Sequence, residues 1–438
     1  MTSQSVLTND PLERIHELTR SSEKLFVRAQ NLLPSGSTRA PFFGPPYPLY
    51  LSRAEGCYVW DVDGNRYLDF TNNYGPLILG HRHPSVENAV VKQVHAFWCG
   101  GPTELELELA DKILGAYPNM DKIAFTPSGT EAVLRLVRAI RASTGKKKLA
   151  MSTGAFHGTS DSVSSGPGTV PEVESLVCRY RYNDIDSLRS VLKNNKGDLA
   201  AVFLEGVLGT AGSVPPSIEF LKVLREETNS AGIVLVFDEI VTGFRLARGG
   251  ISELYKVSPD CVSLGKIIGG GFPVGAFLGP DSIMKEFSFP TAKYPLVGRP
   301  RLFGGGTFNA HPVTMAAGLA TLDVLKPNVY DSLNNFGERV RAMLSKSAEE
   351  AHVSNYVTGI GSLFRLHFTT SQIVDYESAQ SFSDEKKGRI FDLLLRSKFV
   401  NLARFHTSFC STPMGSKEFQ MFEEAVVSSL SELKALDA

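Results

Sequence analysis

The stretch Ile233–Gly271 reads IVLVFDEIVTGFRLARGGISELYKVSPDCVSLGKIIGGG and holds two short apolar runs. The first, Ile233–Phe237, is rich in β-branched residues and is followed by Asp238. The second, Cys261–Leu264, is followed after one glycine by Lys266. Continuous apolar runs of this length are typical of strands buried on both faces of a parallel sheet. Ligands of open α/β sheets bind at the carboxyl ends of such strands, so both charged residues are predicted to face one ligand site.

A lysine and an aspartate at one sheet edge favour a particular chemistry. A lysine amine can form a Schiff base with an aldehyde, and a carboxylate can keep a heteroaromatic nitrogen protonated. Pyridoxal phosphate uses both groups in the proteins that bind it. The alternative is that Lys266 lies on the surface and Asp238 caps a helix, which is the commoner situation for either residue alone. The motifs around them favour the cofactor.

The segments FDEIVTGFR (Phe237–Arg245) and SLGKIIGGGFPVGAF (Ser263–Phe277) resemble the class III pyridoxal-phosphate aminotransferases of fold type I. Within that family the chain is similar to the branch of glutamate-1-semialdehyde 2,1-aminomutase and the β-amino-acid transaminases. The resemblance extends from about Gly36 into the C-terminal part of the chain. It implies an α/β fold with a large, mostly parallel sheet flanked by helices, and a smaller α+β domain built from both ends of the chain.

Length and composition agree with such an enzyme. The 438 residues are too many for one typical core and indicate a large and a small domain. We predict an N-terminal segment (residues 1–75) that joins the small domain, a cofactor domain (76–322) and a C-terminal small domain (323–438). The net charge of −1 gives no sign of nucleic acid or an anionic membrane as a partner. Five scattered cysteines, without metal-ligand spacing, favour a cytoplasmic enzyme with reduced thiols and no metal.

Apolar patterns predict the order of the elements. A helix is expected over Pro11–Leu33, a hairpin with its turn at Asp63-Gly64, and a helix from about Val86 to Trp98. Six strands, most of them alternating with helices, are expected in the large domain: Ile123–Thr126, Leu149–Met151, Leu176–Cys178, Ala201–Leu204, Ile233–Phe237 and Cys261–Leu264. The small domain is expected to hold helices near Val329–Glu349 and Glu385–Ser397, with strands within Ser362–Phe368 and Phe399–Ala403.

Ser128, Gly129 and Thr130 lie between a predicted strand and a well-marked helix. Small residues let backbone N–H groups approach a phosphate, and a helix N-terminus adds positive potential. An ordinary N-cap by Ser128 or Thr130 is the alternative. The resemblance implies that these three residues form the phosphate loop.

The resemblance assigns further residues to the cofactor site. Phe156 stands where the family usually has a tyrosine whose ring covers the cofactor, although a phenylalanine is more often a core residue. His157 is next to it. Glu205 begins a segment that usually reads Glu-Pro-Val, and Ile240 follows the Asp238-Glu239 pair.

Two threonines bear on the reaction and the assembly. Thr210 stands where the aminomutases usually carry an asparagine near the cofactor's phenolic oxygen. Thr307 belongs to Gly306-Thr307-Phe308-Asn309, which is closer to the β-amino-acid transaminases than to the aminomutase form Gly-Thr-Leu-Ser-Gly-Asn-Pro. In the family this threonine reaches the cofactor phosphate of the neighbouring subunit, which implies a homodimer with active sites at the interface.

Three residues are candidates for binding the substrate. Arg39 resembles the arginine that holds a substrate carboxylate in this branch, and Arg404 resembles a second one that binds an acceptor carboxylate. Arginine suits both tasks through its bidentate fork. Tyr74 stands where the family has an aromatic residue that lines the pocket. Each could instead be an ordinary surface or packing residue. The segment Phe287–Phe303, with Tyr294 and Arg299, is expected to form a loop near the active site.

The sequence therefore predicts a homodimeric aminotransferase that moves an amino group between a carboxylated amine, such as a β-amino acid, and a keto acid by a ping-pong mechanism. Lys266 would hold the cofactor and then act as general base and acid. An intramolecular aminomutase is the first alternative. A binding or regulatory module that has kept the fold is a second. A nicotinamide dehydrogenase is weaker, because no G-x-G-x-x-G follows a strand.

Overall fold

A seven-stranded sheet forms the centre of the protein in the computed structural model, which describes residues 10–39, 44–288, 301–403 and 407–437. The strand order is β4-β10-β9-β8-β7-β5-β6. The pairs β5–β6, β5–β7, β7–β8 and β8–β9 are parallel. The strands are β4 (Lys122–Thr126), β5 (Lys148–Ser152), β6 (Val177–Tyr180), β7 (Leu199–Glu205), β8 (Val234–Asp238), β9 (Cys261–Gly265) and β10 (Gly275–Gly279). The predicted α/β fold and all six predicted strands are confirmed.

Strand β10 was not expected, and it is antiparallel to both of its neighbours, β4 and β9. Its ends are glycines, and Gly275 pairs with Thr126 on one side and Gly265 on the other. A Cβ atom on Gly275 would lie 2.1 Å from the carbonyl oxygen of Ser128. The missing side chain therefore lets β10 support the turn that leads from β4 into the next helix.

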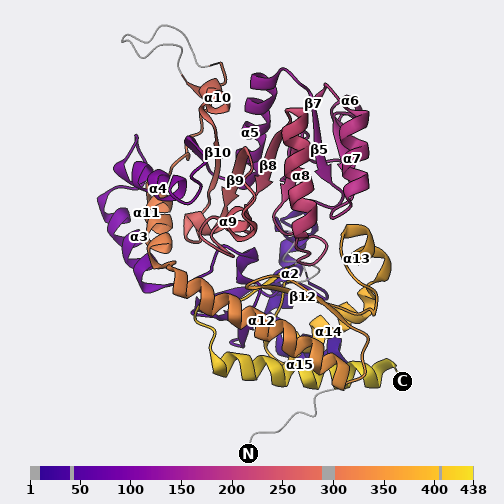
Figure 1. Cartoon of the computed structure of the whole chain (residues 1–438). Helices are drawn as coiled ribbons and strands as arrows, with labels where there is room; N and C mark the ends of the chain where they lie inside the picture. The colour runs from indigo at the N-terminus through magenta and orange to yellow at the C-terminus, as the bar shows by residue number, and fades with distance from the viewer. Residues whose placement is uncertain (1–9, 40–43, 289–300, 404–406, 438) are drawn as a thin grey trace, which may run out of the picture.

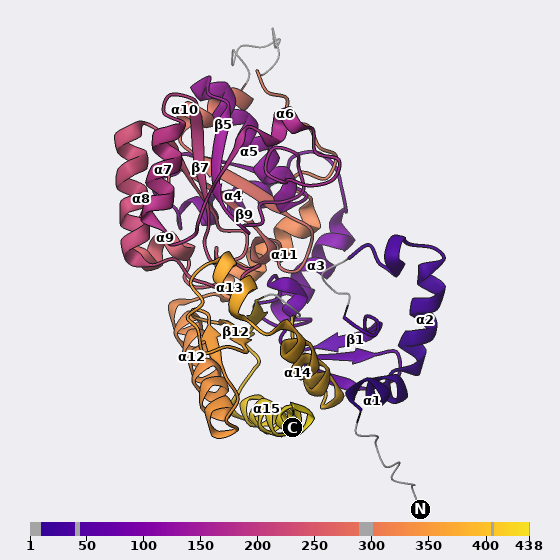
Figure 2. The same ribbon diagram turned by 90° about the vertical axis from the view of Figure 1, so that its right-hand side faces the viewer.

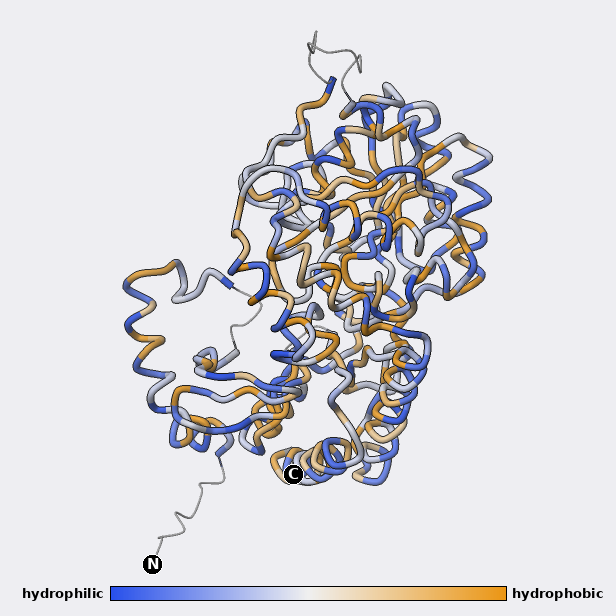
Figure 3. Tube along the Cα trace, turned by 90° about the vertical axis from the view of Figure 1, so that its left-hand side faces the viewer, coloured by the Kyte–Doolittle hydropathy of each residue, from blue (hydrophilic) through white to orange (hydrophobic). Residues whose placement is uncertain are grey.

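Helices cover both faces of this sheet, as Figures 1 and 2 show. Along β7 the residues alternate between two cores: Val202 and Leu204 join one with α7 and α8, whereas Ala201 and Phe203 join the other with α5. This two-sided burial explains why the strands read as continuous apolar runs. Figure 3 shows the same distribution, with hydrophobic segments inside and hydrophilic ones along the outer helices. The helices of this part are α5 (Gly129–Thr144), α6 (Pro171–Glu174), α7 (Ile185–Asn194), α8 (Ile218–Ala231), α9 (Gly250–Tyr255) and α10 (Asp281–Met284).

The second part of the molecule contains two smaller sheets. One has the order β1-β2-β3-β13 and joins the N-terminal segment to the C-terminal region; the other has the order β11-β12-β14. The predicted hairpin is β2 and β3. The strands are β1 (Leu51–Glu55), β2 (Tyr58–Asp61), β3 (Arg66–Asp69), β11 (Tyr356–Thr358), β12 (Leu363–His367), β13 (Val400–Asn401) and β14 (Ser408–Phe409). The helices are α13 (Tyr376–Phe382), α14 (Glu385–Ser397) and α15 (Ser416–Asp437).

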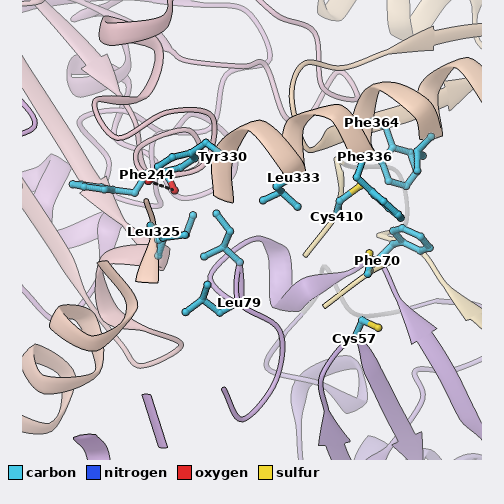
Figure 4. Close-up of a cluster of buried hydrophobic side chains, with 14 of the residues drawn as sticks. Cys57, Phe70, Leu79, Phe244, Leu325, Tyr330, Leu333, Phe336, Phe364 and Cys410 are labelled. Atoms are coloured by element: carbon cyan, nitrogen blue, oxygen red, sulfur yellow. Dashed lines mark hydrogen bonds between the residues drawn. The ribbon is translucent and has the colours of Figure 1, made fainter. Parts of the chain in front are cut away.

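The long helix α12 (Pro327–Glu350) connects the two parts. Figure 4 shows Leu325, Tyr330 and Leu333 between Phe244 on one side and Phe364 on the other. The Tyr330 hydroxyl donates to the carbonyl of Phe244 at 3.4 Å. Helices α3 (Pro84–Ala96), α4 (Glu104–Leu114) and α11 (Pro312–Val324) pack together beside it. The domain boundaries at residues 75 and 322 remain a prediction. Among the described residues, no helix combines the length and apolar character needed to cross a membrane.

The single helix predicted over Pro11–Leu33 is wrong. The chain forms α1 (Pro11–Leu18) and α2 (Arg20–Gln30), separated at Thr19, whose φ of −132° and ψ of 39° are not helical. The Thr19 hydroxyl donates to the carbonyl of Ile15 at 2.6 Å and also contacts the Tyr47 hydroxyl. This side chain competes with the helical hydrogen bonds, as threonine hydroxyls do, and a pattern of apolar residues does not reveal it.

Candidate active site

The carboxyl ends of three neighbouring strands bring the predicted cofactor residues together. The register pairs Glu205 of β7 with Asp238 of β8, and Asp238 with Ser263 of β9. Strand β9 leads directly into Lys266, the first residue of the short helix η4 (Lys266–Gly269). Lys266 has φ = 49°, a left-handed conformation that is uncommon for a residue with a side chain. Such conformations cluster at functional sites.

Lys266 has an environment that favours its neutral amine. Burial lowers the pKa of Lys266 to about 8, although the negative charges of Glu205 and Asp238 act in the opposite direction. An amine with this pKa is deprotonated in a substantial fraction near neutral pH, and only the deprotonated amine is a nucleophile.

Asp238 is buried and fixed by two contacts. One carboxylate oxygen, Oδ2, lies 2.7 Å from Nδ1 of His157, and the other accepts the backbone N–H of Ile240 at 3.1 Å. The Nε2 atom of His157 is also buried and has no hydrogen-bond partner among the described residues. The pair therefore presents a rigid carboxylate at the sheet edge, which suits the recognition of a protonated ring nitrogen.

Glu205 adds a second buried carboxylate. It accepts the backbone N–H groups of Phe156 at 3.2 Å and of Gly209 at 3.3 Å. Burial raises the pKa of Glu205 to about 7; the nearby His157 lowers it and Asp238 raises it. The site thus holds one carboxyl, Glu205, and one amine, Lys266, whose pKa values are both shifted toward neutrality, an arrangement found at catalytic centres.

The Ser128-Gly129-Thr130 turn forms the N-terminus of α5. Ser128 does cap the helix, because its hydroxyl accepts the N–H of Glu131 at 3.2 Å. The cap uses only the N–H of Glu131, so it is compatible with an anion bound by other N–H groups of the first turn. A Cβ on Gly129 would lie 2.7 Å from Cδ1 of Ile240, so the backbone of this turn packs tightly on Ile240.

Two other segments lie near the predicted cofactor residues. A Cβ on Gly158 would lie 2.8 Å from Oγ1 of Thr130, which places the His157-Gly158 turn against the α5 terminus. The Phe156 side chain is 60% exposed, so it is not a core residue. The Thr210 hydroxyl donates to the carbonyl of Gly154. This packing and the donor set fit a phosphorylated heteroaromatic cofactor: a helix N-terminus, an exposed aromatic ring, a buried carboxylate and a lysine.

The predicted substrate residues lie on other elements. Arg39 is exposed, and its Nη2 donates to Oδ1 of Asn73 at 2.6 Å. Tyr74 is half-buried, and burial raises its pKa to about 12, with Arg39 acting in the opposite direction. Arg39, Asn73 and Tyr74 line a cavity of about 510 Å³ together with Arg396, and no predicted cofactor residue lines it.

The other residues predicted for the active site lie on the surface or outside the described residues. Thr307 is exposed on the surface of this chain. Arg404, and Tyr294 and Arg299 of the predicted loop, lie outside the described residues. The structure adds Arg245, which is fully buried and donates to the carbonyls of Gly75 at 2.5 Å and Cys410 at 2.8 Å. The sequence feature that could have pointed to Arg245 is its place at the end of the FDEIVTGFR motif.

Known proteins resemble this chain along nearly its whole length. The family model described as "Aminotransferase class-III" matches residues 44–388. A glutamate-1-semialdehyde 2,1-aminomutase of Methanosarcina acetivorans is 36% identical over 425 residues, covering 93% of this chain and 98% of its own length. A relative of the same name from Methanothrix thermoacetophila is 39% identical over 89% of this chain and 92% of its own.

Solved structures are similar as well. An omega-transaminase from Sphaerobacter thermophilus has a TM-score of 0.89 and 35% identity, covering 96% of this chain and 99% of its own. A β-phenylalanine aminotransferase from Variovorax paradoxus has a TM-score of 0.89 and 31% identity, covering 98% and 97%. A transaminase with bound pyridoxal phosphate has a TM-score of 0.87 and 32% identity, covering 95% and 99%. Taken together, these similarities support the aminomutase alternative better than the expected β-amino-acid transaminase.

Proposed function

We propose a reaction for this chain from the premise that it belongs to the class III aminotransferase family, whose members are pyridoxal 5'-phosphate-dependent enzymes. We infer that it moves an amino group on a small carboxylated substrate. The observation that carries this proposal is the juxtaposition of Lys266, Asp238 and Glu205 at one sheet edge, with burial lowering the pKa of Lys266 to about 8.

Pyridoxal phosphate, when bound, supplies an electron sink for the charge that develops at the amine-bearing carbon. Lys266 would hold the cofactor and, once released, would take a proton from the substrate carbon and return it at a second position. Asp238, fixed by His157, would keep the ring nitrogen protonated.

The remaining residues would bind and orient. Ser128, Gly129 and Thr130 would hold the phosphate at the N-terminus of α5. Phe156 would cover one ring face, and Ile240 and Glu205 would limit the space around the ring. Arg39 would bind the substrate carboxylate, and Tyr74 would line the pocket beside it.

The first candidate reaction is the intramolecular one, in which glutamate-1-semialdehyde becomes 5-aminolevulinate without a keto-acid partner. It is supported by relatives named glutamate-1-semialdehyde 2,1-aminomutase that are 36% and 39% identical over most of the chain. This candidate replaces the β-amino-acid transaminase as the leading hypothesis.

The second candidate is transfer between a β-amino acid or similar amine and a keto acid. It is supported by the omega-transaminase and the β-phenylalanine aminotransferase structures, at 35% and 31% identity. The Gly306–Asn309 segment and Thr210 point the same way. Residue 210 is a threonine, so it has no carboxamide where the aminomutases usually carry an asparagine. Its hydroxyl instead donates to the Gly154 carbonyl.

A homodimer with shared active sites is also proposed. Thr307 is exposed between Phe303 and Phe308, whose side chains are 78% and 58% exposed. Exposed aromatic residues around a polar one are typical of an interface.

A cytoplasmic location is proposed from the five cysteines, all of which are free.

One experiment separates the two reactions. The purified holoenzyme is mixed, without any keto acid, with glutamate-1-semialdehyde or with β-phenylalanine, and both the cofactor absorbance and the products are followed. Conversion of the semialdehyde to 5-aminolevulinate in many turnovers supports the aminomutase. A single bleaching by β-phenylalanine, reversed by pyruvate or 2-oxoglutarate, supports the transaminase. If no amine changes the cofactor absorbance, the proposed activity is wrong.

A further inference from the structure

We infer that Asn73 is a positioning residue that fixes the Arg39 guanidinium for the substrate carboxylate and thereby sets the preference for carboxylated amines. This inference rests on the proposed function, in which Arg39 binds that carboxylate. Its central observation is the 2.6 Å hydrogen bond from Nη2 of Arg39 to Oδ1 of Asn73, between residues that both line the same cavity.

Asn73 sits in an unusual turn. The short helix η3 (Asn72–Tyr74) has left-handed φ values at all three residues, namely 51°, 52° and 63°. Asparagine tolerates this conformation better than most residues, whereas tyrosine does not. A run of such residues persists only where the surroundings hold it.

Buried polar groups hold this turn in place. The carboxylate of Asp69 accepts the backbone N–H groups of Thr71 at 3.0 Å and Asn72 at 3.3 Å. Behind it, His81 and Asn401 bind the same carboxylate at 3.0 and 3.1 Å. These contacts form on the side of the turn that leads into Asn72.

Arg245 fixes the other end of the turn. It donates to the Gly75 carbonyl at 2.5 Å and approaches the Asn72 side chain at 3.4 Å. The turn is thus fixed at both ends, and the Asn73 side chain is presented at a defined place.

The chemistry of the contact suits this role. A carboxamide oxygen accepts one N–H of the guanidinium without neutralising its charge, and the planar fork has five N–H donors. Arg39 itself is exposed, and ordering a long exposed side chain costs conformational entropy. A partner that holds it before the substrate arrives lowers that cost at binding.

The test compares Asn73→Asp and Asn73→Gly with the wild-type holoenzyme, using whichever of glutamate-1-semialdehyde and β-phenylalanine reacts. Aspartate keeps the shape and tolerates the left-handed backbone, but its charge competes with the substrate carboxylate for Arg39. Glycine keeps the backbone conformation without strain and removes the carboxamide. We expect the KM to rise about tenfold or more for the aspartate variant, and less for the glycine variant, with kcat within about twofold of wild type.

A second readout excludes a merely structural effect. Inhibition by 4-oxopentanoate is compared with inhibition by its uncharged analogue 2-pentanone. In both Asn73 variants, inhibition by 4-oxopentanoate should weaken and inhibition by 2-pentanone should stay unchanged. Arg39→Ala is measured in parallel. If Arg39→Ala leaves the KM and the carboxylate inhibition unchanged, the proposed carboxylate site is wrong. If Arg39→Ala weakens both but the Asn73 variants do not, the positioning role alone is overturned. A fall in kcat with equal weakening of both inhibitors would also overturn it.

Discussion

The proposed active site has two sets of residues, a cofactor end and a substrate end, and the two are built differently. At the cofactor end, Glu205 and Asp238 stand beside each other in paired strands, and Lys266 follows the next strand. At the substrate end, Arg39 lies in a loop and Asn73 in a left-handed turn, joined by one hydrogen bond across 34 positions of sequence. Sheet register places the groups proposed to hold the cofactor, whereas loops place the groups proposed to bind the substrate, as is common where a rigid scaffold carries variable loops.

The largest effect should come from the cofactor end. Replacing Lys266 with alanine removes the proposed attachment point and the general base, so turnover should fall by about 10⁴-fold or more. Steady-state kinetics measures this. Lys256→Ala is the matched control, because Lys256 is exposed yet shares the left-handed backbone, with φ = 54°. Near-normal turnover of the Lys266 variant would contradict the assignment.

Asp238→Asn should reduce kcat by about 10²-fold or more, because an amide does not stabilise a protonated ring nitrogen as a carboxylate does. The KM should change little, since Arg39 belongs to the substrate end. Asp281→Asn serves as control, because Asp281 is an exposed partner of Lys122. A variant that changes KM and leaves kcat intact would remove the proposed division between the two ends.

Gly275→Ala tests the packing beneath the phosphate loop. The added Cβ would lie 2.1 Å from the Ser128 carbonyl oxygen, so the backbone must shift. We expect a loss of about 1–3 kcal/mol in the free energy of unfolding and weaker cofactor binding. Thermal unfolding and cofactor titration measure these changes. Gly101→Ala, where nothing lies within 4 Å, should leave both unchanged. Equal behaviour of the two variants would show that β10 does not support the loop.

The smallest effect concerns pH. The Glu205 charge raises the pKa of Lys266 against burial, which lowers it to about 8. Glu205→Gln removes that charge, so the pKa of Lys266 should fall further and the neutral amine should predominate from a lower pH. The rate of cofactor capture by the apoenzyme, followed against pH, should therefore rise with a midpoint near 8 in the wild type and lower in the variant. Glu172→Gln, an exposed site, is the control. A midpoint that moves upward would contradict the electrostatic account.

Much of the cofactor end could be predicted from the sequence. The apolar runs that form β8 and β9 are long enough to identify, and parallel strands bring their ends to one edge. The contact between His157 and Asp238 spans 81 positions and has no local signal. Strand β10 was missed because a short segment with a glycine at each end, following a proline, has the composition of a loop.

Less of the substrate end could be predicted. The resemblance named Arg39 and Tyr74, but nothing local indicated that Asn73 would meet Arg39. Consecutive asparagines at 72 and 73 do suggest a left-handed backbone, since this residue type tolerates it. The direction in which this turn points the Asn73 side chain depends on Arg245, which binds Gly75, and on Asp69, which is held by Asn401. Both of these contacts are long-range.

The most direct test of the central claim is to locate the lysine that carries the cofactor. The holoenzyme is reduced with borohydride, digested, and the pyridoxyl-modified peptide is identified by mass spectrometry. The modification should lie on Lys266 alone, at the end of β9. A modification on another lysine, or none in a protein that still contains the cofactor, would contradict the placement of the chemistry at this sheet edge.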